Sequence, residues 1–225
     1  ITVTGSAQDD SFTVSDVDED DSIDGGDGED TVINTGTFDG ATLTDVEALE
    51  NTKQDDGTVE INLTNAVDIT EIDISGQNIV DFDLTNLSDG SVITFNVDDT
   101  LELTDTAEAS LADDDDSSDS LAFVFEGNGA FSQNGSELDF NALEELSITI
   151  NQNGSAQFDS VVGTGTDTIE SIVLAGTDSI QFGSGTQINS TATDELEINA
   201  TGMEAGFTMA DGASQEYVTT DGTLT

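Results

Sequence analysis

The chain repeats one short segment, which reads Glu145-Leu-Ser-Ile-Thr-Ile150, then Glu170-Ser-Ile-Val-Leu174, then Glu195-Leu-Glu-Ile198. The first residues of these copies are spaced 25 positions apart, and Glu71-Ile-Asp-Ile74 is an earlier copy. Apolar and polar residues alternate within each copy, so an extended strand would carry its apolar side chains on one face. The segment therefore predicts a recurring β-strand that is buried on one side.

A second alternating segment follows most copies of the first. We assign to it Val59-Glu-Ile-Asn-Leu63, Val80-Asp-Phe-Asp-Leu84, Ile93-Thr-Phe-Asn-Val97 or Leu101-Glu-Leu103, Gln157-Phe158, Ile180-Gln-Phe182 and Gly206-Phe-Thr-Met209. A period of this length is typical of solenoids, whose coils bury a shared core by stacking. We predict an all-β parallel β-solenoid (a β-helix or β-roll) with coils of about 25 residues, six or seven of them from Glu47 onward. An antiparallel β-sandwich is the alternative.

Charge limits the functions that this chain can have. Fifty Asp and Glu residues face a single basic side chain, Lys53, which gives a net charge of −49 in 225 residues. Salt bridges cannot neutralise this excess, so counter-ions must do so, either as concentrated monovalent salt or as bound Ca²⁺. Nucleic acids and anionic lipids would be repelled, and no apolar run is long enough for membrane insertion. With no His, Cys or Arg, we expect no enzyme and no zinc site.

The N-terminal segment carries the chemical motif. Residues 25–33 read Gly-Gly-Asp-Gly-Glu-Asp-Thr-Val-Ile and match the pattern G-G-x-G-x-D-x-U-x, in which U is apolar. Degraded copies begin at Gly5 and Asp16. They align Asp10 and Asp21 with Asp30, each two positions before an apolar residue, and a weaker echo contains Asp167. Each such turn offers half of a cation site, with glycines such as Gly25 permitting the tight backbone.

The aspartates of this segment also allow a second interpretation, as the loop of an EF-hand. Asp16, Asp18 and Asp20, followed by Asp27, imitate the ligand spacing of an EF-hand loop. The loop lacks the sharp-turn glycine, because Asp21 occupies that position, and Asp27 stands where a bidentate glutamate belongs. The candidate metal ligands are therefore Asp10, Asp18, Asp20, Asp21, Gly25, Asp27, Asp30 and Asp167.

The nonapeptide, together with residues 40–49 and 59–66, resembles repeats-in-toxin (RTX) calcium-binding proteins and calcium-dependent bacterial surface-layer proteins. This resemblance implies an extracellular structural protein whose coils are ordered by Ca²⁺ and whose copies assemble. We divide the chain into RTX-like turns at residues 1–36 and a solenoid body at residues 37–225, with an acidic inserted loop near residues 105–120.

We therefore expect a calcium-ordered protein that self-assembles into an S-layer, sheath or filament at the cell surface. Its partners would be other copies bridged by calcium, with cell-surface polysaccharide as a second candidate. One alternative is an adhesin or spacer segment of a giant type I-secreted surface protein. Another is a halophile protein that is stabilised by bulk salt alone.

Overall fold

The computed structural model describes residues 1–52, 57–66, 69–75, 79–97, 101–104, 107–112, 118–133, 136–141, 143–152, 154–164, 169–189 and 197–209. These residues form strands and turns only, without a helix, so none of them could build a membrane-spanning helix. Alternating apolar residues and abundant Val, Ile and Thr favour this outcome, because such side chains pack well on a pleated surface. Lys53 lies outside the described residues.

The strands are β1 (Thr2–Thr4), β2 (Ser11–Val14), β3 (Ser22–Asp24), β4 (Thr31–Asn34), β5 (Phe38–Asp39), β6 (Thr42–Thr44), β7 (Ala48–Asn51), β8 (Gly57–Asn62), β9 (Glu71–Ser75), β10 (Ile79–Leu87), β11 (Ser91–Val97), β12 (Leu101–Leu103), β13 (Ala107–Leu111), β14 (Ser120–Gly127), β15 (Phe131–Gln133), β16 (Leu138–Asn141), β17 (Glu145–Gln152), β18 (Ala156–Thr164), β19 (Ser171–Gly176), β20 (Ile180–Asn189), β21 (Glu197–Met203) and β22 (Phe207–Met209).

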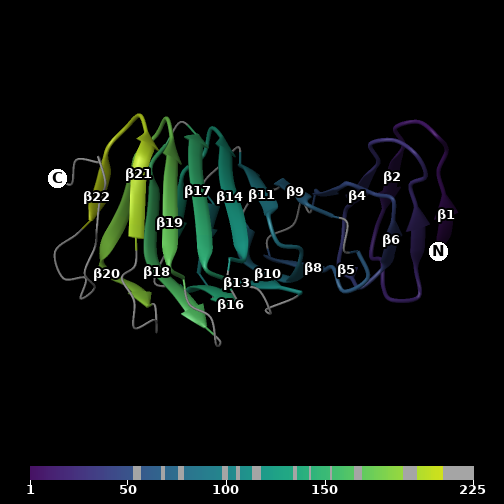
Figure 1. Ribbon diagram of the computed structural model, residues 1–225, viewed down its shortest axis with the longest axis horizontal. Coiled ribbons are helices and arrows are strands. Elements are labelled where there is room, and N and C mark those ends of the chain that lie inside the picture. Colours follow the sequence, from purple (N-terminus) through teal and green to yellow (C-terminus); the bar gives the residue numbers. More distant parts are fainter. Residues whose placement is uncertain are drawn as a thin grey trace.

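The strands stack into long parallel sheets (Figure 1). One sheet has nine strands in the order β2-β4-β7-β9-β11-β14-β17-β19-β21, and a ten-stranded sheet contains β5, β8, β10, β12, β13, β15, β16, β18, β20 and β22. A three-stranded sheet, β1-β3-β6, completes the first coils. The described strand pairs are parallel, which confirms the solenoid and excludes the antiparallel sandwich. Seven strands of the nine-stranded sheet follow Glu47, in agreement with the predicted six or seven coils.

The register of the coils differs from the spacing seen in the sequence. Leu146 pairs with Ile172, and Ile172 pairs with Ile198, so these coils advance by 26 residues instead of the predicted 25. The reason is the two-residue period of a strand: a slip of one residue would turn Ser171 inward and Ile172 outward. Elsewhere the offset varies from 17 residues, between Val32 and Leu49, to 31, between Ala107 and Leu138.

Two further predictions need correction. Of the two candidates for one second strand, Ile93–Val97 lies in β11, within the nine-stranded sheet that holds the first strands, so that alternative is wrong. The other candidate, Leu101–Leu103, is confirmed as β12 of the ten-stranded sheet. Residues 107–111 were assigned to an inserted loop, but they form β13 of the ten-stranded sheet, with Ala107 and Ala109 buried. Alanine has a low strand propensity, which is why its alternation was missed. The acidic run at residues 113–116 lies outside the described residues.

Stacked phenylalanines fill the core between the two large sheets. Phe95 is fully buried, and its ring centroid lies 5.3 Å from that of Phe82, 5.6 Å from Phe123 and 5.2 Å from Phe125. Phe125 continues the row to Phe131 at 4.6 Å. Because aromatic pairs at these distances add to the free energy of burial, the row joins successive coils into one cooperative core.

The nine-stranded sheet runs without a break from the N-terminal turns into the body. β4 pairs with β7, and β7 pairs with β9, so residues on both sides of position 36 share the nine-stranded sheet. The N-terminus lies at one end of the elongated molecule, and the last coils lie at the other (Figure 1). The division into two segments at residue 36 stays a prediction about their role.

We predict that Phe95→Ala lowers the free energy of unfolding by about 3 to 5 kcal/mol, because it leaves a cavity among several aromatic rings. The neighbouring Asn96→Ala is the control, since Asn96 is exposed and should change stability by less than about 0.5 kcal/mol. Urea unfolding at fixed salt measures both. Equal effects of the two substitutions would contradict the buried aromatic row.

Candidate metal-binding turns

The nonapeptide turn lies in a stack of three turns along one edge of the solenoid. Residues 25–30 connect β3 to β4, residues 5–10 connect β1 to β2 in the preceding coil, and residues 45–47 connect β6 to β7 in the following coil. The backbone N–H of Asp10 donates to Oδ1 of Asp30 at 2.6 Å. The N–H of Asp30 donates in turn to Oε2 of Glu47 at 2.7 Å. Carboxylates thus connect the three turns.

Asp30 is the most informative residue of this stack. Its side chain is fully buried, with 0% of its surface exposed. While Oδ1 accepts the bond from Asp10, Oδ2 is buried without a hydrogen-bond partner among the described residues. A buried carboxylate oxygen without a donor or cation is strongly unfavourable. A cation or a hydrogen-bond donor beside Oδ2 of Asp30 would therefore lower the energy of the turn stack.

Glycines allow the turns to pack this closely. A Cβ atom placed on Gly25 would lie 1.9 Å from the carbonyl oxygen of Asp45 and 2.5 Å from Oδ2 of Asp30. One placed on Gly5 would lie 2.1 Å from the carbonyl oxygen of Gly25. Gly26 and Gly28 have φ values of 97° and 143°, which side-chain-bearing residues rarely adopt. The glycines of the motif are therefore required by the packing of adjacent coils.

Asp18, Asp20 and Asp21 lie on the opposite edge, in the turn between β2 and β3. They mainly bond to one another's backbone: the N–H of Asp18 donates to Oδ2 of Asp21, and the N–H of Asp20 donates to Oδ1 of Asp18, both at 3.1 Å. The sequence aligns Asp21 with Asp10 and Asp30, but Asp21 lies in the turn at the other edge of the coil. The structure therefore does not bring these three residues together.

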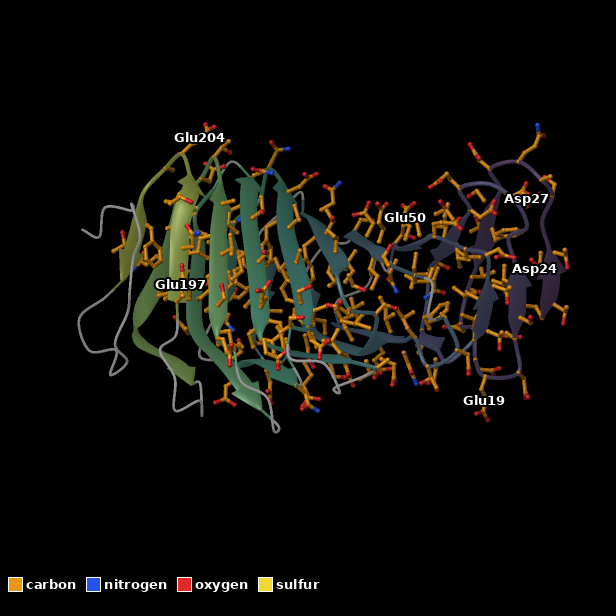
Figure 2. The ribbon with its side chains drawn as sticks, viewed as in Figure 1. Glu19, Asp24, Asp27, Glu50, Glu197 and Glu204 are labelled. Carbon is orange, nitrogen blue, oxygen red and sulfur yellow. The ribbon has the colours of Figure 1, made fainter. Side chains whose placement is uncertain are left out.

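The EF-hand-like reading requires residues 16–27 to form one loop. Strand β3 interrupts this segment and carries Asp27 to the edge opposite Asp18 and Asp20. Asp27 is exposed, and its N–H donates to the carbonyl oxygen of Ser6 at 3.2 Å. Figure 2 shows its position among the acidic side chains of the first coils. Asp167 lies outside the described residues.

The turn stack fits Ca²⁺ in its donor chemistry. Oxygen atoms are the ligands that Ca²⁺ prefers, and both carboxylates and backbone carbonyls serve. Within the described chain, no group of three or more acidic side chains is arranged to hold a metal ion. A cation beside Asp30 would therefore need backbone carbonyls of the glycine turns to complete its coordination.

Two members of the stack were missed as site residues in the sequence. Glu47 directly precedes β7 as Asp30 directly precedes β4, and this shared position before a strand was the available signal. Gly5 precedes Asp10 by the same five positions that separate Gly25 from Asp30. The spacing of Gly5 can be seen in the sequence alone, whereas the signal of Glu47 depends on knowing which strands are stacked.

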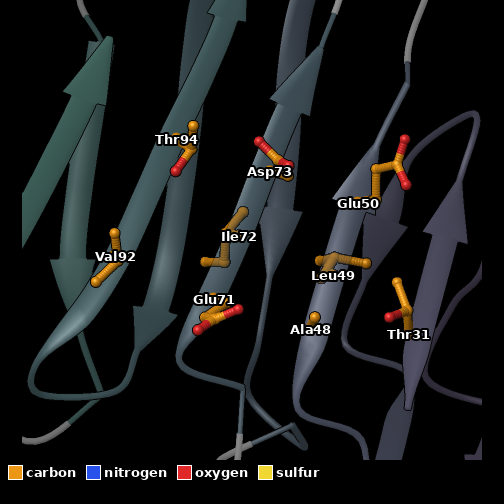
Figure 3. A pocket seen from close by; sticks show the side chains of 9 residues that line it. All are labelled: Thr31, Ala48, Leu49, Glu50, Glu71, Ile72, Asp73, Val92 and Thr94. Atoms are coloured by element: carbon orange, nitrogen blue, oxygen red, sulfur yellow. The ribbon is translucent and has the colours of Figure 1, made fainter. Parts of the chain in front are cut away.

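A second concentration of charge lies on the outer face of the nine-stranded sheet. A hollow of about 450 Å³ there is lined by Glu50, Glu71 and Asp73 together with Thr31, Ala48, Leu49, Ile72, Val92 and Thr94 (Figure 3). Glu50 and Asp73 are directly paired across β7 and β9. Burial against the sheet, and then the charges of Glu50, Glu126 and Glu71, raise the pKa of Asp73. The hollow is therefore a place of like-charge repulsion.

Comparisons with protein-family models, with curated proteins and with solved structures find no match to this chain.

We predict that Gly25→Ala destabilises the fold by about 2 to 4 kcal/mol, because the added methyl group would overlap a backbone carbonyl of the next coil. Gly206→Ala is the matched control, since nothing lies within 4 Å of its Cβ position. It should change stability by less than about 0.5 kcal/mol. Urea unfolding of both variants tests this, and similar losses would argue against close packing at Gly25.

We predict that Asp73→Asn stabilises the protein at neutral pH and low salt. The raised pKa means that ionised Asp73 destabilises the folded state. This destabilisation is fully present above the folded pKa of Asp73 and absent below its ordinary pKa of 3.8. A like-charge pair across strands costs about 0.2 to 1 kcal/mol, which corresponds to a melting-temperature rise of about 0.4 to 4 °C. Thermal unfolding from pH 7 to pH 3 should show the gain disappearing in acid. A gain that persists in acid would contradict this origin.

Proposed function

We propose that this chain is a structural protein of the cell exterior, and that Ca²⁺ bound in its N-terminal turn stack orders the coils. In this proposal its copies assemble into an S-layer, sheath or filament, and calcium bridges carboxylates of neighbouring copies. Localisation outside the cell follows from the resemblance of residues 25–33 to RTX repeats and belongs to the same proposal.

The buried carboxylate of Asp30 is the observation that carries the proposal. It has 0% exposure, one oxygen without a partner, and Asp10 and Glu47 in the adjoining turns. The ion pair found in the described chain joins the terminal ammonium of Ile1 to Asp21, on the opposite edge. A divalent cation beside Asp30 would offset its burial and the repulsion between the stacked turns.

The body of the solenoid adds a second argument for counter-ions. Glu60, Asp83, Glu108 and Asp139 are paired in register on four consecutive strands, β8, β10, β13 and β16. Since adjacent strands are about 4.8 Å apart, these carboxylates form a row with one charge at every strand spacing. Such a row attracts cations strongly, which supports a protein that functions in a calcium-rich or salt-rich exterior.

The alternative function is a monomeric adhesin or spacer segment of a larger surface protein. The nine-stranded sheet is continuous, so the stacked solenoid is a stiff rod. Stiffness is the property that a spacer requires. A spacer needs no contact between copies, whereas a building block does. Cell-surface polysaccharide is a second candidate partner for either function.

We predict that Ca²⁺ stabilises the wild-type protein and that Asp30→Asn removes most of this gain. At a hundredfold excess over the dissociation constant, one site contributes about 2.7 kcal/mol. Without calcium, Asp30→Asn should be at least as stable as the wild type, because it removes a buried charge. Urea unfolding across a calcium titration measures both effects.

Glu204→Gln is the control for this prediction. It removes the same single charge from an exposed position in the turn between β21 and β22, outside both the turn stack and the carboxylate row, so its calcium-dependent gain should equal that of the wild type. An equal loss in both variants would mean that calcium acts through net charge. If EGTA changes neither stability nor assembly of the wild type at low salt, calcium has no structural role.

Assembly and salt dependence separate the alternatives. We predict that light scattering of the wild-type protein rises with millimolar Ca²⁺ as ordered polymers form. A stiff monomer that binds calcium without polymerising would support the spacer. If molar NaCl fully replaced calcium in both assays, the halophile interpretation would hold.

A further inference from the structure

The outer face of the nine-stranded sheet has an unusual distribution of charge. Its outward side chains form two central rows, which the strand registers define. The first row runs Ser11, Thr31, Ala48, Glu71, Val92, Ala122, Ser147, Val173 and Asn199, and the second runs Thr13, Ile33, Glu50, Asp73, Thr94, Val124, Thr149 and Ala175. The charged members, Glu50, Glu71 and Asp73, lie on β7 and β9.

Beyond β9 these rows carry no charge over four strands. We call this region the neutral strip; it consists of Val92, Thr94, Ala122, Val124, Ser147, Thr149, Val173 and Ala175, on β11, β14, β17 and β19. Its side chains are aliphatic or carry one hydroxyl group. Val173 is 39% exposed, one of two large apolar residues that are exposed in the described chain. Figure 1 looks onto these strands, and no described segment covers them.

The opposite sheet presents a different surface. Its outward positions on β8, β10, β13 and β16 include the row of four carboxylates formed by Glu60, Asp83, Glu108 and Asp139. Two copies that met through this sheet would place these carboxylates against one another. On β15, β18, β20 and β22 this sheet also has one uncharged outward row, formed by Ser132, Gln157, Gln181 and Thr208, with Asp159 as the next outward position on β18. The neutral strip differs because it is two rows wide over four strands.

We propose that the neutral strip is the surface through which a second copy of this chain packs, sheet against sheet. The inference rests on the proposed self-assembly and specifies which face makes the contact. Each copy carries a net charge of −49, so the contact that costs least in repulsion is one that joins uncharged surface to uncharged surface. Small and β-branched side chains also allow two sheets to approach to the usual separation of about 10 Å.

The size of the strip explains why this contact would need many copies. Four strands with two outward residues each cover on the order of 250 Å² per copy, well below the roughly 800 Å² of a stable two-protein interface. The strip is also bordered by acidic residues whose charges would add repulsion in such a contact: Glu71 and Asp73 on β9, Glu126, Glu145 and Glu197. One contact is therefore weak and depends on cations at its border, whereas an array repeats it many times.

Ser147→Glu tests this inference, with Ser132→Glu as the matched control. Both serines are partly exposed and outward-facing in strands, Ser147 within the strip on β17 and Ser132 on β15 of the other sheet. We expect Ser147→Glu to raise the protein concentration at which calcium induces assembly by at least about tenfold, because each contact gains a buried charge. Ser132→Glu should assemble as the wild type does, although its register neighbour is Glu102.

A labelling experiment gives a readout that does not depend on a disruptive charge. Because the chain has no cysteine, Ser147→Cys and Ser132→Cys each introduce one thiol with a small change in volume. In calcium-induced assemblies, a maleimide dye should label Cys at position 147 at least about tenfold more slowly than in the monomer, and position 132 at an unchanged rate. Sedimentation confirms that the labelled material is assembled.

The outcomes separate this inference from the proposed function. Normal assembly of Ser147→Glu together with unprotected labelling at position 147 would overturn the neutral strip as the contact and leave calcium-dependent assembly intact. Protection at position 132 as well as 147 would also overturn it, since the contact would then not be confined to one face. If the wild type does not assemble with calcium at all, the proposed function is wrong, and so is the inference that rests on it.

Discussion

In-register stacking is the constraint on which the rest of this structure depends. Each coil places its side chains about one strand spacing, or 4.8 Å, from the corresponding side chains of the next coil. Similar residues at the same position of successive coils therefore form a row along the axis of the solenoid. Inside, this stacks Phe95 on Phe125 in one sheet and Phe158 on Phe182 in the other. Outside, it produces rows of carboxylates such as Asp83 beside Glu108. The same geometry that stabilises the core concentrates the charge.

Carboxylates in the N-terminal turn stack and carboxylates on the strands differ in their exposure to water. On the strands, carboxylates point into solvent, where screening limits their repulsion. In the turn stack, Asp30 is buried, and its backbone and side chain both bond to acidic neighbours. Water cannot screen a group that it does not reach. A bound cation would lower the energy of this turn, and the proposed function therefore assigns calcium to the N-terminal coils, which are shorter than the later ones.

The sequence predicted the parallel solenoid because alternation and period are properties of single strands and of their spacing, both of which can be read along the chain. It did not predict the register, since Glu170 and Glu195 align by identity at 25 residues while burial of Ile172 and Ile198 requires 26. For the site, the pattern around Gly25 and Asp30 was sufficient to find the central turn. Glu47 could not be recognised as its neighbour, because that relation exists only once β4 and β7 are paired.

The uneven distribution of charge distinguishes two explanations of the acidic composition. A chain that used carboxylates only for solubility would gain by placing them on every exposed strand position. Here the outward positions of β14, β17 and β19 in the two central rows hold Ala122, Val124, Ser147, Thr149, Val173 and Ala175 instead. Between the two large sheets, one outer face thus carries a row of four carboxylates on β8, β10, β13 and β16, and the other contains an uncharged region that is two rows wide. In the proposed assembly, this difference favours contact through the nine-stranded sheet, and the acidic residues around the neutral strip would make that contact depend on the cations of its surroundings.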